Sequence, residues 1–227
     1  MMINSKLIKG IATDLGFDLC GIAPIDRFSN APVGFHPTDI YEDCKSVIVF
    51  AKTVPNEPLN ASSFIPYSHL GSLIIQEVDN LTVKLTRNLE KLGIGAVPIP
   101  SDDPYEYWEP DRLYGRAILS LRHAGHLAGL GVLGKNTLLI NNQFGNMIQL
   151  GAILVNIDLE GDQIADYEGC LHDCEICINS CPKQALDGIT VNQKLCRSNS
   201  IYKHQKGYVL KKCNTCRKVC PHVTGIN

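Results

Sequence analysis

The chain has 227 residues, ten cysteines and a formal net charge of −2, and 44% of its residues are hydrophobic. These values are ordinary for a globular protein, and the length allows one larger and one smaller domain. No run of about 18 apolar residues occurs, so we expect no transmembrane helix. Residues 1–10 lack the apolar core of a secretory leader, and we therefore expect a cytoplasmic protein with no membrane partner.

The first part of the chain alternates helix and strand patterns. An amphipathic helix is predicted over Ile3–Leu15, because its apolar residues share one face, and Gly16 ends it. Asp18–Ile25 is predicted as a short strand. Ser46–Val54 is β-branched and mostly apolar, which is typical of a buried central strand. Residues 26–43 are rich in turn-forming residues and are predicted as a loop.

The longest predicted helix is Leu70–Leu92, where apolar residues recur at steps of three and four. The acidic, aromatic stretch Ser101–Tyr114 is predicted as a solvated loop, with a lid over a site as the alternative. The other predicted elements are a strand over Ala96–Ile99, a helix over Ala117–Leu127, and strands over Thr137–Asn141 and Met147–Asn156. Together these patterns predict an α/β (α+β) domain over residues 1–160 and a second domain over residues 161–227.

A glycine-rich segment resembles two phosphate-binding motifs. Gly129, Gly131 and Gly134 match G-x-G-x-x-G, and the addition of Lys135 gives nearly a P-loop. Both motifs need a strand before them and a helix after them, whereas here a predicted helix comes first and a strand follows. The context therefore argues against a phosphate site. Glycines still let a backbone approach a large ligand closely.

Eight of the ten cysteines fall in two runs near the end of the chain. The first run is Cys170-x3-Cys174-x2-Cys177-x3-Cys181-Pro182, and the second is Cys196 followed by Cys213-x2-Cys216-x3-Cys220-Pro221. Each run ends in the C-x2-C-x3-C-P pattern of bacterial two-cluster ferredoxins. Two [4Fe–4S] clusters need eight thiolates, so count and spacing independently predict two such clusters.

In such ferredoxins the last cysteine of a run binds the other cluster. Cluster one then takes Cys170, Cys174, Cys177 and Cys220, and cluster two takes Cys181, Cys196, Cys213 and Cys216. The gap after Cys170 is x3 instead of x2, but no other free cysteine lies nearby. Zinc sites also use C-x2-C pairs, and a disulfide framework needs an oxidising compartment. Neither alternative explains two repeats of x3-C-P. Cys20 and Cys44 are predicted as small core residues.

Charge is unevenly distributed along the chain. Residues 182–227 hold nine Lys or Arg and a single acid, Asp187, whereas residues 1–181 hold 12 basic and 22 acidic side chains. The cations either offset the negative charge of the clusters or form a surface for an acidic partner.

The order of these pieces resembles the epoxyqueuosine reductase family of cobalamin-dependent iron–sulfur proteins. The stretches that carry the resemblance are LGFDLCGIAP (15–24), SVIVFA (46–51), AGLGVLGKNTLLIN (128–141), LGAILVN (150–156) and the two cysteine runs. The resemblance implies a nitroreductase-like corrinoid-binding domain followed by a ferredoxin-like domain whose two [4Fe–4S] clusters feed electrons to cobalt.

The resemblance also implies site residues. It puts Gly131, Gly134, Lys135, Asn136 and Thr137 against the corrinoid, with Ser198 near it, and it puts His69 near an active-site histidine of the family. The family's acid falls at Gly115 by simple counting, and Asp111 is the nearest acid. The family's C-terminal helical repeats do not follow residue 227. We therefore expect a shortened paralogue that does not itself reduce epoxyqueuosine in tRNA.

These features predict an oxidoreductase in which the clusters pass single electrons to cobalamin. FMN is the alternative second cofactor, giving a flavin-dependent reductase. A ferredoxin-type electron carrier and a corrinoid-handling protein without turnover are further alternatives. The expected partners are a ferredoxin or flavodoxin as reductant, and a small molecule or a corrinoid protein as substrate. His123 and His126 share a helix face, and we expect them to pack rather than to bind a metal.

Overall fold

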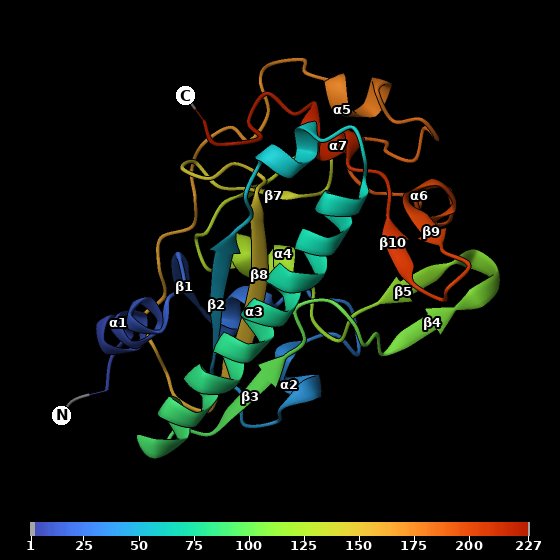
Figure 1. Cartoon of the computed structure of the whole chain (residues 1–227). Helices are drawn as coiled ribbons and strands as arrows, with labels where there is room; N and C mark the ends of the chain where they lie inside the picture. The colour runs from blue at the N-terminus through green and yellow to red at the C-terminus, as the bar shows by residue number, and fades with distance from the viewer. Residues whose placement is uncertain (1–2, 227) are drawn as a thin grey trace.

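A four-stranded antiparallel sheet organises the fold, which is a mixed α/β arrangement in the computed structural model of residues 3–226 (Figure 1). The strand order is β1-β2-β8-β3. The bounds are Leu19–Pro24 for β1, Ser46–Thr53 for β2, Ile148–Val155 for β8 and Ala96–Ile99 for β3. β2 pairs with β1 on one side and with β8 along its whole length on the other. The prediction of a buried central strand over Ser46–Val54 is therefore confirmed.

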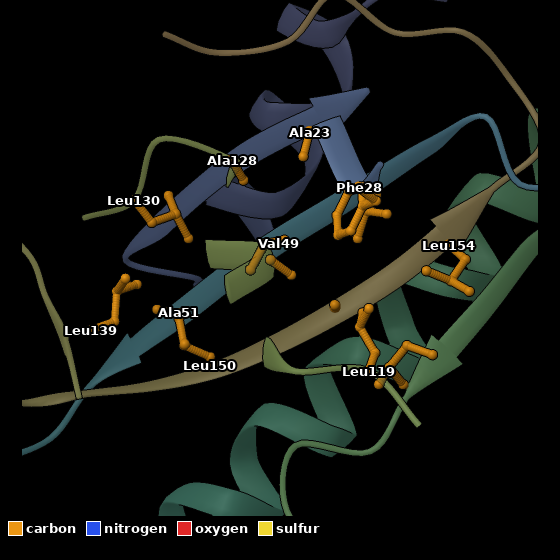
Figure 2. Close-up of a cluster of buried hydrophobic side chains, with 14 of the residues drawn as sticks. Ala23, Phe28, Val49, Ala51, Leu119, Ala128, Leu130, Leu139, Leu150 and Leu154 are labelled. Carbon is orange, nitrogen blue, oxygen red and sulfur yellow. The ribbon is translucent and has the colours of Figure 1, made fainter. Parts of the chain in front are cut away.

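Alternate residues of β2 enter two hydrophobic cores, because successive side chains of a strand point to opposite faces. Val47, Val49 and Ala51 pack on one face, in the core that also includes residues of α4 (Leu121–Leu127). Figure 2 shows this core. Ile48 and Phe50 pack on the other face, against α1 (Ser5–Leu15) and α3 (Ile65–Lys91). Helices on both faces explain why β2 is almost continuously apolar.

The two long helices agree with their predicted patterns. The Asn4 side chain accepts a hydrogen bond from the N–H of Leu7 and caps α1, and Gly16 ends this helix with φ of 103°. α3 begins at Ile65, five residues before its predicted start. Pro66 is compatible with this earlier start, because the first turn of a helix does not need its backbone N–H.

The middle of the chain differs from prediction in three places. The predicted loop Ser101–Tyr114 contains most of a hairpin, because β4 (Tyr107–Glu109) pairs with β5 (Tyr114–Arg116). The predicted helix over Ala117–Leu127 is shortened to α4. The predicted strand Thr137–Asn141 is shortened to β7 (Leu139–Ile140), since Thr137 has a left-handed φ of 62°. β7 pairs with β6 (Val132–Leu133) and not with β8.

The chain after β8 consists of short elements, some of which lie beyond one end of the main sheet and some beside α3 (Figure 1). These elements are α5 (Ile176–Asn179), α6 (Gln193–Ser200), β9 (Ile201–Lys203), β10 (Val209–Lys211) and α7 (Thr215–Lys218). Elsewhere, the region predicted as a loop over residues 26–43 contains one helical turn, α2 (Pro37–Ile40), and part of a 3-10 turn. The 3-10 turns are Ile25–Phe28, Glu57–Asn60 and Pro110–Arg112. Among residues 3–226, none of the helices combines the length and apolar character that a membrane crossing requires.

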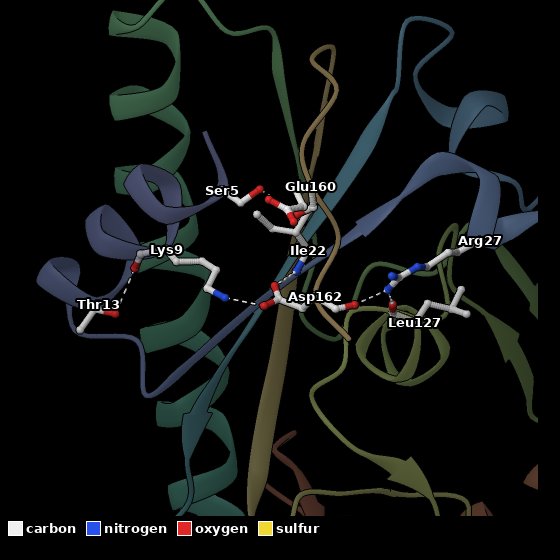
Figure 3. A network of polar contacts seen from close by, with 8 residues as sticks. All are labelled: Ser5, Lys9, Thr13, Ile22, Arg27, Leu127, Glu160 and Asp162. Atoms are coloured by element: carbon white, nitrogen blue, oxygen red, sulfur yellow. Dashed lines mark hydrogen bonds and ion pairs between the residues drawn. The ribbon is translucent and has the colours of Figure 1, made fainter. Parts of the chain in front are cut away.

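Asp162 fastens the segment after the sheet to the beginning of the chain (Figure 3). Its carboxylate accepts hydrogen bonds from Lys9 Nζ and, over 2.9 Å, from the N–H of Ile22. Arg27 Nη1 donates to the backbone oxygen of Asp162 over 2.7 Å. These bonds join residue 162, which was predicted to belong to the second domain, to residues of the first domain. The predicted domain boundary at residue 160 is not tested by them and stays a prediction.

Candidate functional site

Four cysteines from the two runs line one small cavity. Three belong to the first run and one to the second: Cys170, Cys174, Cys177 and Cys220. This is the set predicted for cluster one. Burial raises the pKa of Cys177, and the neighbouring thiols of Cys170, Cys220 and Cys174 raise it further. The folded chain therefore holds these thiols close enough to oppose each other's ionisation, which a bound cation or cluster would relieve.

The remaining four cysteines form a second neighbourhood. The pKa of Cys216 is raised to about 11, chiefly by burial and in addition by the thiols of Cys196 and Cys213. Burial also raises the pKa of Cys196, to which Cys213 and Cys181 add. Cys181 from the first run is therefore grouped with three cysteines around the second, as predicted for cluster two.

Polar groups lie beside several of these sulfur atoms. The N–H of Lys135 donates to Cys170 Sγ over 3.4 Å, and the N–H of Ala185 donates to Cys181 Sγ over 3.3 Å. The hydroxyl of Ser200 lies 3.9 Å from Cys196 Sγ. Hydrogen bonds to ligand sulfur atoms raise the reduction potential of an iron–sulfur cluster, so both groups have the surroundings that such clusters need.

The arrangement differs from that of a mononuclear metal site. Within residues 3–226, no three His, Cys, Asp or Glu side chains gather closely enough to bind one metal ion. A structural zinc site needs four ligands around one ion. A cubane needs a wider set, because each thiolate binds a different iron atom. Two neighbourhoods of four thiols fit clusters of this kind.

The glycine-rich segment forms the β6–β7 hairpin, preceded by α4, which agrees with the predicted rejection of a phosphate motif. A Cβ at Gly131 would lie 2.4 Å from the backbone oxygen of Ile140, and one at Gly134 would lie 2.5 Å from Ile140 Cδ1. The structure thus explains these glycines by contacts within the chain. Asn136 is buried, and its Nδ2 donates to the backbone oxygen of Cys216 over 3.3 Å. The segment therefore contacts both cysteine runs.

His69 and Ser198 lie on separate helices. His69 is exposed near the start of α3, next to Ser68, whose hydroxyl accepts a hydrogen bond from the N–H of Lys211 over 2.9 Å. Ser198 is exposed on α6, and its hydroxyl donates to the backbone oxygen of Leu195 over 2.8 Å. Among the hydrogen bonds within residues 3–226, none joins either side chain to the glycine-rich segment.

His123 and His126 each have a local hydrogen-bond partner. His123 Nδ1 lies 2.6 Å from Ser120 Oγ, and His126 Nδ1 lies 2.9 Å from the backbone oxygen of Gly131. Burial lowers the pKa of His123, and Arg122 and His126 lower it further. The neutral imidazole is therefore favoured at this position.

An open groove lies elsewhere on the surface, beside the end of β2 and the middle of α3. Its lining is Lys52, Thr53, Val54, Pro55, Asn56, Ile74, Glu77, Phe144, Met147 and Thr224. No residue predicted to bind a cofactor belongs to this lining.

Comparison with known proteins gives consistent relatives, although no protein-family profile matches the chain. Epoxyqueuosine reductase from Lactococcus garvieae is 29% identical over 197 residues, which is 82% of this chain and 54% of that protein. Epoxyqueuosine reductase from Leadbetterella byssophila is 27% identical over 96% of this chain and 79% of that protein. The sequence is therefore similar to epoxyqueuosine reductases along most of its length. It spans about half the length of the first of these relatives.

Solved structures show the same fold. An epoxyqueuosine reductase from Streptococcus thermophilus superposes with a TM-score of 0.67 at 19% identity, covering 97% of this chain and 66% of that one. A catabolic reductive dehalogenase bound to 3-bromo-4-hydroxybenzoic acid gives a TM-score of 0.69 at 16% identity, covering 94% of this chain and 31% of that one. A related dehalogenase structure is described as suggesting a mechanism for B12-dependent dehalogenation.

The position expected for the family's acid lies in the β4–β5 hairpin. Gly115 is buried there, and a Cβ at this residue would lie 3.0 Å from the ring of Tyr105. Asp111 is exposed in the turn between the two strands. The contacts of this hairpin with α6 were missed at the sequence level. The spacing of Gln193 and Arg197, one helical turn apart, is the signal that points to them.

Proposed function

We propose that the chain is an iron–sulfur redox protein in which two [4Fe–4S] clusters pass single electrons to a bound corrinoid. The observation that carries the proposal is the position of Cys220, which lines the cavity of the first cysteine run although it belongs to the second. This exchange of ligands is what the two-cluster ferredoxin pattern requires. In this proposal a ferredoxin-like region carries the clusters and a nitroreductase-like region carries the second cofactor.

Each cluster takes one of the two neighbourhoods. Cluster one is held by Cys170, Cys174, Cys177 and Cys220, and cluster two by Cys181, Cys196, Cys213 and Cys216. Clusters of this type supply one-electron transfer when bound. The chain contributes the thiolates, the donors beside the sulfur atoms, and burial that limits the access of water.

The corrinoid is proposed because of the similarity to the relatives named above. The contacts within the chain reduce the number of side chains that could bind it. A Cβ at Gly131 or Gly134 would meet Ile140, and the Asn136 amide donates to the backbone oxygen of Cys216. The side chains of Lys135, Thr137, His69 and Ser198 are therefore the remaining candidates. A corrinoid supplies a strongly reducing cobalt centre when it is reduced.

Titration of the anaerobically reconstituted protein tests this second cofactor. Hydroxocobalamin should change its absorbance on binding, whereas FMN at the same concentrations should not. A response to FMN alone would favour a flavin-dependent reductase. The absence of a response to either compound would favour a plain electron carrier.

The substrate has one specific candidate. The expectation that the chain does not reduce epoxyqueuosine is not supported, because the relatives named above are epoxyqueuosine reductases. One solved relative carries a tRNA stem loop modified with epoxyqueuosine. In this chain the β9–β10 hairpin exposes Tyr202 and Tyr208, and it carries Lys203 and Lys206. Exposed aromatic and basic side chains together are typical of surfaces that bind single-stranded nucleic acid.

Binding of a fluorescent epoxyqueuosine-modified stem loop tests this candidate. The double substitution Lys203→Gln and Lys206→Gln should weaken binding several-fold, because each lysine removed takes away an attraction to phosphate. The control is Lys183→Gln, an exposed lysine outside the hairpin. If the wild type, the double variant and Lys183→Gln bind the stem loop with equal affinity, the hairpin is not its binding surface and a small-molecule substrate is favoured.

A further inference from the structure

The β4–β5 hairpin is held on α6 by the side chain of Gln193. Its Oε1 accepts from the N–H of Gly115 over 3.0 Å, and its Nε2 donates to the backbone oxygen of Gly115 over 2.9 Å. One side chain therefore satisfies both polar backbone groups of a buried residue, in the manner of a neighbouring strand.

Arg197 makes the second attachment, one turn further along α6. Its Cζ lies 5.2 Å from the ring centre of Tyr105 and 5.1 Å from that of Trp108, and the two ring planes are inclined by 10°. Its Nη2 donates to the Tyr105 hydroxyl over 2.9 Å, and its Nε donates to Gln193 Oε1 over 3.3 Å. The guanidinium therefore lies near two aromatic rings and also donates two hydrogen bonds in a fixed planar geometry, which an ammonium group lacks.

The same helix carries a proposed ligand of cluster two. Cys196 is the immediate neighbour of Arg197 and lies one turn after Gln193. We propose that Arg197 is a positioning residue that fixes the Tyr105–Arg116 hairpin on the helix of cluster two and places a positive charge beside Cys196. Gln193 assists by fixing Gly115. The charge effect rests on the proposed clusters, whereas the attachment of the hairpin does not.

Hydrogen exchange followed by mass spectrometry tests the attachment on the reconstituted full chain. Arg197→Gln removes the cation–π contacts, Arg197→Lys removes the guanidinium hydrogen bonds, and Gln193→Leu removes the pair of hydrogen bonds to Gly115. Each should raise exchange in the peptide covering residues 105–116 by about threefold to tenfold. The control is Lys194→Gln, an exposed neighbour that loses the same charge as Arg197→Gln. Wild-type exchange in all three test variants would overturn the attachment.

The reduction potential of cluster two, followed by electron paramagnetic resonance, tests the charge. Arg197→Gln should shift this reduction potential to a more negative value. Reduction adds negative charge to the cluster, and the substitution removes a nearby cation that stabilises this charge. Arg197→Lys keeps the charge and should keep the potential while it still releases the hairpin. A potential that stays unchanged in Arg197→Gln would overturn the charge effect alone. If no cluster signal is obtained from any variant, the proposed function fails, and the exchange data still decide the attachment.

Discussion

The backbone N–H of Lys135 donates to the sulfur of Cys170 over 3.4 Å, which joins the glycine-rich segment to the first cysteine run. The next residue, Asn136, reaches the second run through the backbone oxygen of Cys216. A hairpin with tightly packed glycines thus contacts both cysteine neighbourhoods. The stability of this hairpin should therefore matter for the clusters as well as for the fold.

Gly131→Ala should destabilise the chain, because the new Cβ would lie 2.4 Å from the backbone oxygen of Ile140. We expect the free energy of unfolding to fall by about 1–3 kcal/mol, as for other overpacked sites. The matched control is Gly10→Ala in α1, where nothing lies within 4 Å of the added carbon. This control should gain about 0.5–1 kcal/mol from helix propensity. Urea denaturation compares the two, and similar changes in both would contradict the packing role.

Asp162→Ala should loosen the segment that joins the sheet to the cysteine-rich third. The substitution removes the carboxylate that accepts from Lys9 and from the N–H of Ile22. A loss of about 1–3 kcal/mol is expected, since the Ile22 donor is left without its partner. Asp158→Ala is the control, because that side chain is 83% exposed and pairs with Lys45 at the surface. Equal unfolding free energies in urea would show that the Asp162 contacts contribute nothing.

Asp18 should make stability depend on pH. Burial opposes its ionisation, but hydrogen bonds from Thr53 and Lys52 outweigh burial and hold its pKa below the ordinary value. A carboxyl group with a lowered folded pKa stabilises the fold above its unfolded pKa, and this stabilisation is lost as the pH falls through the folded pKa.

Asp18→Asn should therefore cost about 0.5–1 kcal/mol at pH 7 and should lose less stability than the wild type when the pH is lowered below about 4. Thermal denaturation at both pH values measures the difference. The exposed Asp14→Asn variant serves as the control. If the stabilities of Asp18→Asn and the wild type change in parallel with pH, Asp18 is not the source of the pH dependence.

Single cysteine substitutions should reveal the exchange of ligands between the runs. Cys181→Ala should damage the same cluster as Cys213→Ala, and Cys220→Ala the same cluster as Cys170→Ala, with iron falling to about four atoms per chain in each. Cys44→Ala should retain both clusters, because Cys44 is buried in the core beside β2. Electron paramagnetic resonance distinguishes the remaining cluster. If Cys181→Ala instead damages the same cluster as Cys170→Ala, the ligand assignment is contradicted.

Local patterns were enough to predict much of the scaffold. β3 has the predicted bounds Ala96–Ile99, and the apolar pattern of Ser46–Val54 identified a central strand, because burial on both faces leaves a continuous apolar run. Cys44 is a core residue as predicted, and burial raises its pKa to about 11. The structure brings the cysteines near one another in the two sets that the ferredoxin pattern predicts, and their role as cluster ligands stays a prediction.

Contacts between distant segments were beyond such patterns. The hairpin in the predicted loop Ser101–Tyr114 is supported by Arg116, whose guanidinium lies 4.8 Å from the ring centre of Phe35 and 4.7 Å from that of Tyr107. The glycines at 131 and 134 looked like positions for a ligand, whereas the structure fills the space beside them with Ile140. Phe35 is remote in sequence from Arg116, and Ile140 comes next to the two glycines only when the β6–β7 hairpin forms. Local sequence patterns do not reveal such contacts.

Iron and sulfide analysis after anaerobic reconstitution, combined with electron paramagnetic resonance of the reduced protein, tests the central claim most directly. Two [4Fe–4S] clusters predict about eight iron and eight sulfide per chain, with a spectrum from two interacting centres. A stable folded protein that binds zinc and takes up no iron would contradict the account.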